Sequence, residues 1–171
     1  MKNHDDFIGS FSFDKRLAPY DIEGSIAHVK MLVKCGIIPS KDGKKIITGL
    51  NDMLVKIKRG VSLPKAEDVH FAVEKELIRK IGPIGGKMHT ARSRNDQVAL
   101  DMRLYLRAET YKILELIKEL QLAISASAQK NIKAVMPGYT HLQPAQPVLF
   151  SHHLLAYGAM FLSTASRSGE S

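Results

Sequence analysis

The sequence has a single cysteine and no long apolar run, and these two absences exclude several classes of protein. Cys35 cannot form an internal disulfide, and its neighbours Met31, Leu32, Val33 and Ile37 predict a buried structural thiol. No stretch approaches the roughly 20 consecutive apolar residues of a membrane span. The first ten residues also lack the basic, apolar and small-residue order of a signal peptide. We therefore expect a cytoplasmic protein that does not bind membranes.

Motifs for metals, phosphate and nucleophilic catalysis are also missing. The sequence has no HExxH motif and no paired cysteines and histidines, and the adjacent His152 and His153 would point in different directions from one helix. The segment Gly82–Gly86 is too short for a phosphate loop and lacks its lysine and serine. No nucleophile elbow supports a hydrolase. We expect no metal site.

Acidic residues are outnumbered, with 17 Asp and Glu against 25 Lys and Arg, which gives a net charge of +8. A positive field attracts anions of every kind, so the sign does not choose a partner. Zinc-finger spacing and aromatic residues interleaved with a basic run are both absent, which argues against nucleic acid. Two interpretations stay open: a polyanionic small substrate, or a charge balanced by the acidic part of a longer chain.

Apolar residues at three- and four-residue steps predict three helices in the first half of the chain. They cover about residues 20–35, 40–60 and 66–80, and each is followed by glycine or proline. The pair Gly85-Gly86 then predicts a flexible joint. We take it as the end of a first domain, residues 1–86.

Glycine and proline are absent from residues 93–130, where apolar side chains form two stripes. A helix that is apolar on two sides packs against neighbours on both. It would be roughly 55 Å long, whereas a compact chain of this size has a radius of gyration of about 15 Å. We therefore expect a bundle, residues 87–171, that is completed by further helices of a longer chain or by partner subunits.

A turn-rich stretch, residues 136–147, separates this helix from an apolar helical run over about residues 148–165. We find no strand pattern of useful length. The expected fold is all-α: a small N-terminal helical domain followed by the first helices of a long, truncated helical bundle.

The segment KMHTARSRNDQ, residues 87–97, has more polar side chains than a scaffold requires. Ser93 followed three residues later by Asp96 is typical of a helix N-cap. A cap does not account for the rest, whose donors suit carboxylates and lie where a helix dipole favours an anion: Arg92, Arg94, Asn95 and Gln97. We predict an anion-binding site here.

The segment GYTHLQPAQP, residues 138–147, has a histidine among prolines, a threonine and glutamines. Thr140, Gln143 and Gln146 could fix a ligand while the imidazole of His141 transfers protons near neutral pH. A lone histidine is more often structural. From the residues alone both interpretations of His141 stay open.

Both segments resemble the signatures of the argininosuccinate lyase family. The first is HTARSRNDQ followed by a long helix that opens with VALDMRLYLR, and the second is GYTHLQ-x-AQP followed by an aliphatic helix. The resemblance extends upstream through SFSFD, DIEGSIAH and EDVH, and so covers nearly the whole chain.

This resemblance implies an enzyme that cleaves argininosuccinate to arginine and fumarate without a cofactor. The reaction removes a proton beside a carboxylate and expels the guanidino nitrogen, and the carbanion needs preorganised donors. The resemblance implies proton transfer by His141, as base or as acid. It implies substrate binding by Ser10, Asn95 and Thr140, and supporting roles for Arg94, Asp68 and His70.

The chain also departs from the family pattern. Family members are far longer, form tetramers, and build each site from three subunits. The flexible GSS-x-MPQKKNP loop, which carries the other proton-transfer residue, is absent here. We therefore predict that the isolated chain is inactive.

Two rival interpretations remain. The chain could be a non-catalytic helical scaffold derived from the same family, as the delta-crystallins are. A sister enzyme acting on adenylosuccinate, aspartate or malate is disfavoured, because HTARSRNDQ belongs to the argininosuccinate branch.

Overall fold

The computed structural model describes residues 9–169. For residues 164–169 it describes the backbone but not the side chains. The chain divides into two compact units, Met1–Leu106 and Arg107–Ser171. The division at residue 86 that the sequence suggests stays a prediction.

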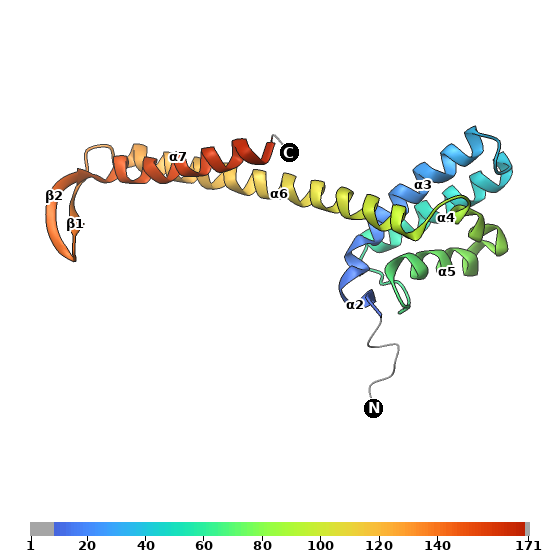
Figure 1. The fold of residues 1–171 in the computed structure, drawn as a ribbon. Helices are drawn as coiled ribbons and strands as arrows, with labels where there is room; N and C mark the ends of the chain where they lie inside the picture. Colours follow the sequence, from blue (N-terminus) through green and yellow to red (C-terminus); the bar gives the residue numbers. More distant parts are fainter. Residues whose placement is uncertain (1–8, 170–171) are drawn as a thin grey trace, which may run out of the picture. The chain divides into compact units, whose positions relative to one another are not determined.

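The first unit is a cluster of helices around one apolar core (Figure 1). The three helices predicted in the first half of the chain are all present, and the all-α class is confirmed. Two short elements at the start were not predicted. In order, the elements are α2 (Phe11–Asp14), the 3-10 helix η1 (Lys15–Leu17), α3 (Ala18–Lys34), α4 (Ser40–Lys58), α5 (Val69–Ile81), the 3-10 helix η2 (Pro83–His89) and the beginning of α6 (Arg94–Lys130).

Glycines with left-handed backbone angles end the first two long helices. Gly36, two residues after the end of α3, has φ +70°, and Ile37 N–H donates to the Leu32 carbonyl over 2.9 Å. Gly60 has φ +87° after α4. Glycine adopts these angles without the steric cost that a Cβ adds, so the helices end where the sequence predicts.

The core of this unit lies between α3, α4 and α5, which pack side by side. The prediction that Cys35 is buried was wrong, because its side chain is exposed. Cys35 is the residue after the last turn of α3, and among its apolar neighbours Leu32 is fully buried whereas Met31 and Ile37 are exposed. The fully buried core side chains include Ile22, Val29, Leu32, Ile46, Leu50, Val73 and Leu77.

The glycines after α5 pack closely, although the sequence suggested a flexible joint. Residues 83–89 form η2, and Gly85 is buried. A Cβ on Gly85 would lie 3.0 Å from the backbone nitrogen of Ile78, whereas a Cβ on Gly86 would meet nothing closer than 3.8 Å. Gly85 therefore permits close contact between η2 and α5.

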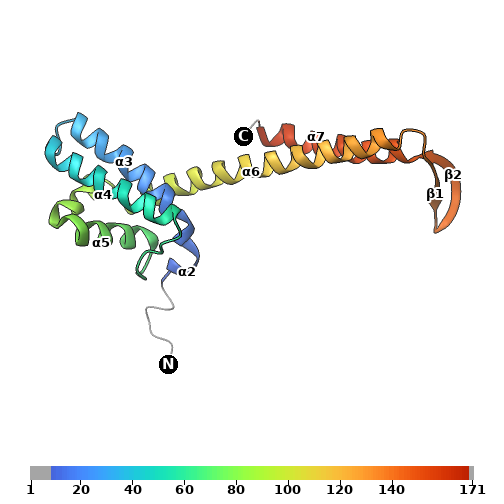
Figure 2. The ribbon, with the colours of Figure 1, turned by 180° about the vertical axis from the view of Figure 1, so that it is seen from behind.

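The second unit contains the rest of α6, a β-hairpin and α7 (Phe150–Gly169). The expectation of no strand was wrong here, because β1 (Val135–Thr140) pairs with β2 (Gln143–Leu149) in an antiparallel two-stranded sheet (Figure 2). Both strands are almost entirely exposed, so no buried face imposes the alternation by which a strand is recognised. Each strand has one neighbour only, which allows its prolines to face away from the ladder.

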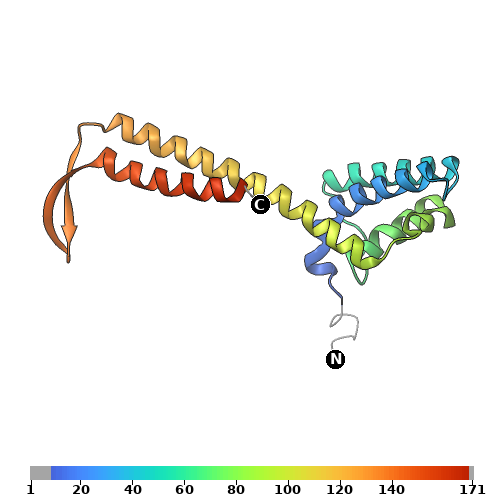
Figure 3. The same cartoon turned by 45° about the horizontal axis from the view of Figure 1, so that its top comes forward.

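Apolar side chains of the second unit remain largely uncovered, as the two stripes of the long helix predicted. α7 runs beside α6, and Ala128 is the only buried hydrophobic residue that the structure describes in this unit (Figure 3). Exposed fractions are 64% for Tyr111, 63% for Leu116 and 63% for Met160. Even so, none of the helices within residues 9–169 is long and apolar enough to cross a membrane.

Candidate active site

The first turn of α6 is capped by its own side chains. The backbone N–H of Asn95 donates to Ser93 Oγ over 3.1 Å, and the N–H of Ser93 donates to Asp96 Oδ2 over 3.3 Å. These reciprocal bonds confirm the predicted cap. The cap leaves Arg94, Asn95 and Gln97 for other contacts.

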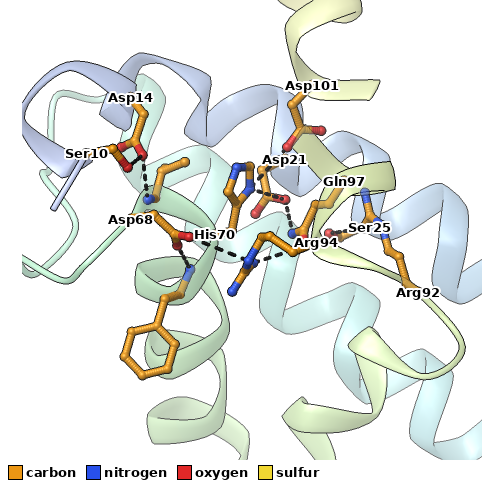
Figure 4. A network of polar contacts seen from close by, with 12 residues as sticks. Ser10, Asp14, Asp21, Ser25, Asp68, His70, Arg92, Arg94, Gln97 and Asp101 are labelled. Atoms are coloured by element: carbon orange, nitrogen blue, oxygen red, sulfur yellow. Dashed lines mark hydrogen bonds and ion pairs between the residues drawn. The ribbon is translucent and has the colours of Figure 1, made fainter. Parts of the chain in front are cut away.

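Arg94 is held at two points beside the start of α5 (Figure 4). Its Nη1 donates to Gln97 Oε1 over 3.1 Å, and its Nε lies 3.5 Å from Asp68 Oδ2. Asp68 is the N-cap of α5 and accepts the Phe71 N–H over 2.6 Å. The guanidinium is therefore fixed against two helix ends while 35% of the side chain stays exposed.

His70 lies between two carboxylates in the interior of the first unit. Its Nδ1 is 3.3 Å from both Asp21 Oδ1 and Asp101 Oδ2, and all three side chains are buried. Neither contact has hydrogen-bond geometry, so both are ion pairs. Burial alone lowers the pKa of His70, but attraction to Asp101 and Asp21 outweighs it and raises the pKa to about 9. His70 is therefore an imidazolium at neutral pH.

For Asp101, burial has the largest effect on the pKa. Burial raises its pKa, the neighbouring Asp21 adds to the rise, and the positive His70 opposes both. Asp21 also accepts a hydrogen bond from Gln97 Nε2. The group thus has one cation, two carboxylates and one amide, with Asp101 the carboxylate that resists ionisation.

This cluster also has the spacing of a metal site. One ligand atom from each of Asp21, His70 and Asp101 lies within 4.8 Å of the others. A metal needs the free lone pair of a neutral imidazole, whereas the raised pKa of His70 keeps that nitrogen protonated. The expectation of no metal site stays a prediction.

Ser10 is fixed beside the start of α5. Its N–H donates to the Glu67 carbonyl over 2.8 Å, and its hydroxyl donates to Asp14 Oδ2 over 2.5 Å. The same Asp14 oxygen accepts the Val69 N–H over 3.3 Å. Ser10 therefore reaches the turn that carries Asp68 and His70.

A cavity of about 530 Å³ opens among these residues. Half of its lining residues are polar or charged, namely Ser10, Asp14, Arg16, Asp68 and His70, and the other half are apolar or aromatic, namely Phe13, Leu17, Val98, Met102 and Tyr105. The structure thus brings three predicted site residues to one cavity, and Arg94 contacts one of them. Asn95 is exposed on the same turn as Arg94.

Thr140 and His141 belong to the second unit, at the tip of the hairpin. His141 and Leu142 form its two-residue turn with φ +48° and +62°. Two consecutive left-handed residues are typical of a type I′ turn, which usually contains Asn and Gly. Non-glycine residues in this conformation are strained, and such strain concentrates at functional sites. His141 is exposed, and Leu142 is 99% exposed.

Sequence reasoning missed part of this arrangement. Gln97 was predicted to be a donor for an anion, but it is fully buried and its amide bonds inside the protein. Arg92 likewise donates to Ser25 over 3.0 Å. Asp21 and Asp101 were not singled out. Asp101 lies one turn after Gln97 and two turns after Arg94, so a polar face of α6 was the available signal.

Comparisons with known proteins agree with the motifs. A family model described as "Lyase" matches residues 3–170. Argininosuccinate lyase from Oceanobacillus iheyensis is 53% identical over 169 residues, which are 98% of this chain and 37% of that protein. The enzyme of that name from Pelotomaculum thermopropionicum is 54% identical over 159 residues, 92% of this chain and 35% of that protein. The chain thus spans little more than a third of these relatives.

Among solved structures, a variant of EDDS lyase with bound fumarate has a TM-score of 0.76 and 30% identity. That match covers 90% of this chain and 30% of the other.

Proposed function

This chain belongs to the lyase family, and we propose that it forms the N-terminal part of an argininosuccinate lyase. The reaction would be the β-elimination of argininosuccinate to arginine and fumarate. The observation that carries the proposal is the 53% identity to argininosuccinate lyases over 98% of this chain. The two signature segments lie within this match.

The reaction creates negative charge beside a carboxylate, and the first unit supplies groups suited to it. Arg94 presents a partly exposed guanidinium that is already oriented by Asp68 and Gln97. A donor fixed before the reaction stabilises developing charge without reorganisation. In the proposed mechanism Arg94, Asn95 and Ser10 bind carboxylates of the substrate. The charge of His70 is balanced by Asp21 and Asp101, so its supporting role is structural.

Proton transfer falls to His141 in this proposal, with Thr140 as a substrate ligand. The strained turn is consistent with such a role, because strain at a turn persists where a particular side-chain placement is needed. The exposed imidazole is free to exchange protons with a bound substrate.

The proposed assembly is a homotetramer in the cytoplasm. The uncovered apolar side chains of α6 and α7 support association, since exposed apolar surface of this extent favours contact with other helices. Neither nucleic acid nor membrane is a proposed partner.

The experiment mixes the purified chain with a separately expressed C-terminal piece of a related lyase that carries the serine loop. Fumarate absorbance is followed with argininosuccinate present. We expect no activity from either piece alone and activity from the mixture. His141→Asn should abolish that activity, whereas His152→Asn, which changes another exposed histidine of the same unit, should not.

An inactive mixture in which the two pieces demonstrably associate would contradict the enzymatic proposal. The chain would then be better described as a scaffold that retains the motifs. Equal activity of the two histidine variants would remove His141 from the mechanism while leaving the family assignment unchanged.

A further inference from the structure

The polar residues around His70 form one connected chain of contacts that reaches the surface at Arg94 (Figure 4). Arg94 contacts Gln97, Gln97 contacts Asp21, and Asp21 contacts His70. These residues come from three helices: α3 carries Asp21, α5 carries His70, and α6 carries Arg94 and Gln97. The contacts therefore link the start of α6 to both neighbouring helices.

Gln97 connects Arg94 to Asp21 through the two different ends of its side-chain amide. Its side chain is fully buried, its amide oxygen accepts from Arg94, and its amide nitrogen donates to Asp21. Rotation of the amide would place a nitrogen against the guanidinium and an oxygen against the carboxylate. Both hydrogen bonds would then be lost. The bond to Asp21 therefore keeps the amide oxygen of Gln97, rather than its nitrogen, directed at Arg94.

Asp21 in turn depends on His70. A fully buried carboxylate is costly unless a cation lies close to it, and His70 is 3.3 Å away. Without the imidazolium, Asp21 would be neutralised or would draw Gln97 and water toward itself.

The solvent exposure of the network residues increases from the interior toward Arg94. Asp21, Gln97 and Asp101 are 0% exposed and His70 is 3% exposed. The side chains of Arg94 and Asp68 are 35% and 24% exposed. The network thus meets solvent at an arginine and its carboxylate partner, beside the turn that carries Asn95.

We propose that Gln97, Asp21 and His70 are positioning residues that hold the Arg94 guanidinium in the orientation in which it receives a substrate carboxylate. The role assigned to Arg94 rests on the proposed function, whereas its fixation by the network does not. Preorganised groups of this kind need a second set of side chains that lock their rotamers.

The test measures the motion of Arg94 directly. The ¹⁵N relaxation of its Nε–H group gives an order parameter, with exposed Arg59 as a mobile reference in the same spectrum. In the wild-type chain we expect about 0.8 or more for Arg94 and below about 0.6 for Arg59. A wild-type value for Arg94 as low as that of Arg59 would overturn the proposal.

Gln97→Met keeps the volume of the side chain and removes both hydrogen bonds. We expect the order parameter of Arg94 to fall below about 0.6. The matched control is Gln121→Met on the same helix, which removes only a 3.4 Å bond to the Gly158 carbonyl and should leave Arg94 unchanged. An ordered Arg94 in Gln97→Met would contradict the role of Gln97.

Asp68→Asn tests the same point without disturbing the interior. It removes the charged partner of Arg94 but keeps an oxygen that can cap α5. We expect Arg94 to remain ordered, because the Gln97 contact persists. Collapse of its order parameter here would mean that Asp68 alone holds Arg94.

Titration with fumarate separates this inference from the proposed function. If the wild-type chain shows no shift of the Arg94 Nε–H signal, the binding role fails, yet the order parameters still decide whether the network positions Arg94. If fumarate shifts the signal, we expect at least a tenfold weaker response in Gln97→Met than in Gln121→Met. Equal binding by the two variants would overturn the positioning role.

Discussion

His70 Nδ1 and Asp101 Oδ2 lie 3.3 Å apart with both side chains buried, in a structure where Asp21 Oδ1 is equally close to the same nitrogen. Two ionised carboxylates beside a neutral imidazole would leave buried negative charge with no cation. The cluster therefore favours the protonated form of His70. The protonation of this group therefore affects the stability of the first unit.

The first prediction concerns pH. The pKa of His70 is about 9 in the folded chain against an ordinary 6.5, since the carboxylates outweigh the effect of burial. A raised pKa means that its stabilising contribution is complete below pH 6.5 and is lost as pH rises through about 9. This shift corresponds to about 3 kcal/mol. Urea unfolding of unit 1 at pH 6.5 and 9.5, followed by circular dichroism, measures the loss.

His152→Asn is the control for this pH dependence, because His152 is exposed and outside the cluster. It should keep the wild-type slope. A wild-type chain equally stable at both pH values would contradict the ion pairs.

The second prediction compares the two partners at the cluster. His70→Leu leaves two buried carboxylates without a cation, so we expect a loss of about 3 to 5 kcal/mol at pH 7. Asp101→Asn keeps the shape and removes the carboxylate whose pKa is raised by burial. Because Asp21 remains as the partner of His70, we expect a change of less than about 1 kcal/mol. Chemical denaturation compares the two variants, and similar losses in both would be inconsistent with unequal roles.

The helices of the first unit could be predicted from sequence for simple reasons. Ser40 follows a proline, Gly60 ends α4, and apolar residues recur at helical steps between them. The capping of α6 by Ser93 and Asp96 depends only on residues three positions apart. Such local signals do not need the tertiary structure.

The polar cluster could not be predicted in the same way. Asp21 and Asp101 each look like part of a solvated helix face, and only packing of α3 against the start of α6 buries them. The hairpin was missed for a related reason. Its exposed strands have no buried face, and its turn uses His141 and Leu142 where an Asn-Gly pair would have been recognised.

The third prediction compares two adjacent glycines. Gly85→Ala would place a Cβ 3.0 Å from the Ile78 backbone, which α5 holds in place, so we expect a loss of about 1 to 3 kcal/mol. Gly86→Ala meets nothing closer than 3.8 Å and should change stability by less than about 0.5 kcal/mol. Thermal unfolding of the two variants decides the point. Equal effects would mean that the segment is flexible, as the sequence first suggested.

The fourth prediction concerns the strained turn. Leu142 has φ +62° and no buried surface, so Leu142→Gly removes the steric cost of this conformation without loss of packing. We expect the hairpin to gain about 1 kcal/mol. Amide hydrogen exchange in β1 and β2 measures the gain. Leu142→Ala removes the same side chain but keeps a Cβ, and it should show little of the effect.

The distribution of the polar cluster over three helices also has a consequence during synthesis. Asp21 and His70 leave the ribosome well before Asp101, so the nascent chain carries both groups hydrated until the first turns of α6 emerge. Docking of α6 then expels that water in one step, because the carboxylates cannot be buried separately from their cation. Emergence of Asp101 from the ribosome is therefore the point at which unit 1 can close, and a pause before that emergence would prolong exposure of the open intermediate to proteases.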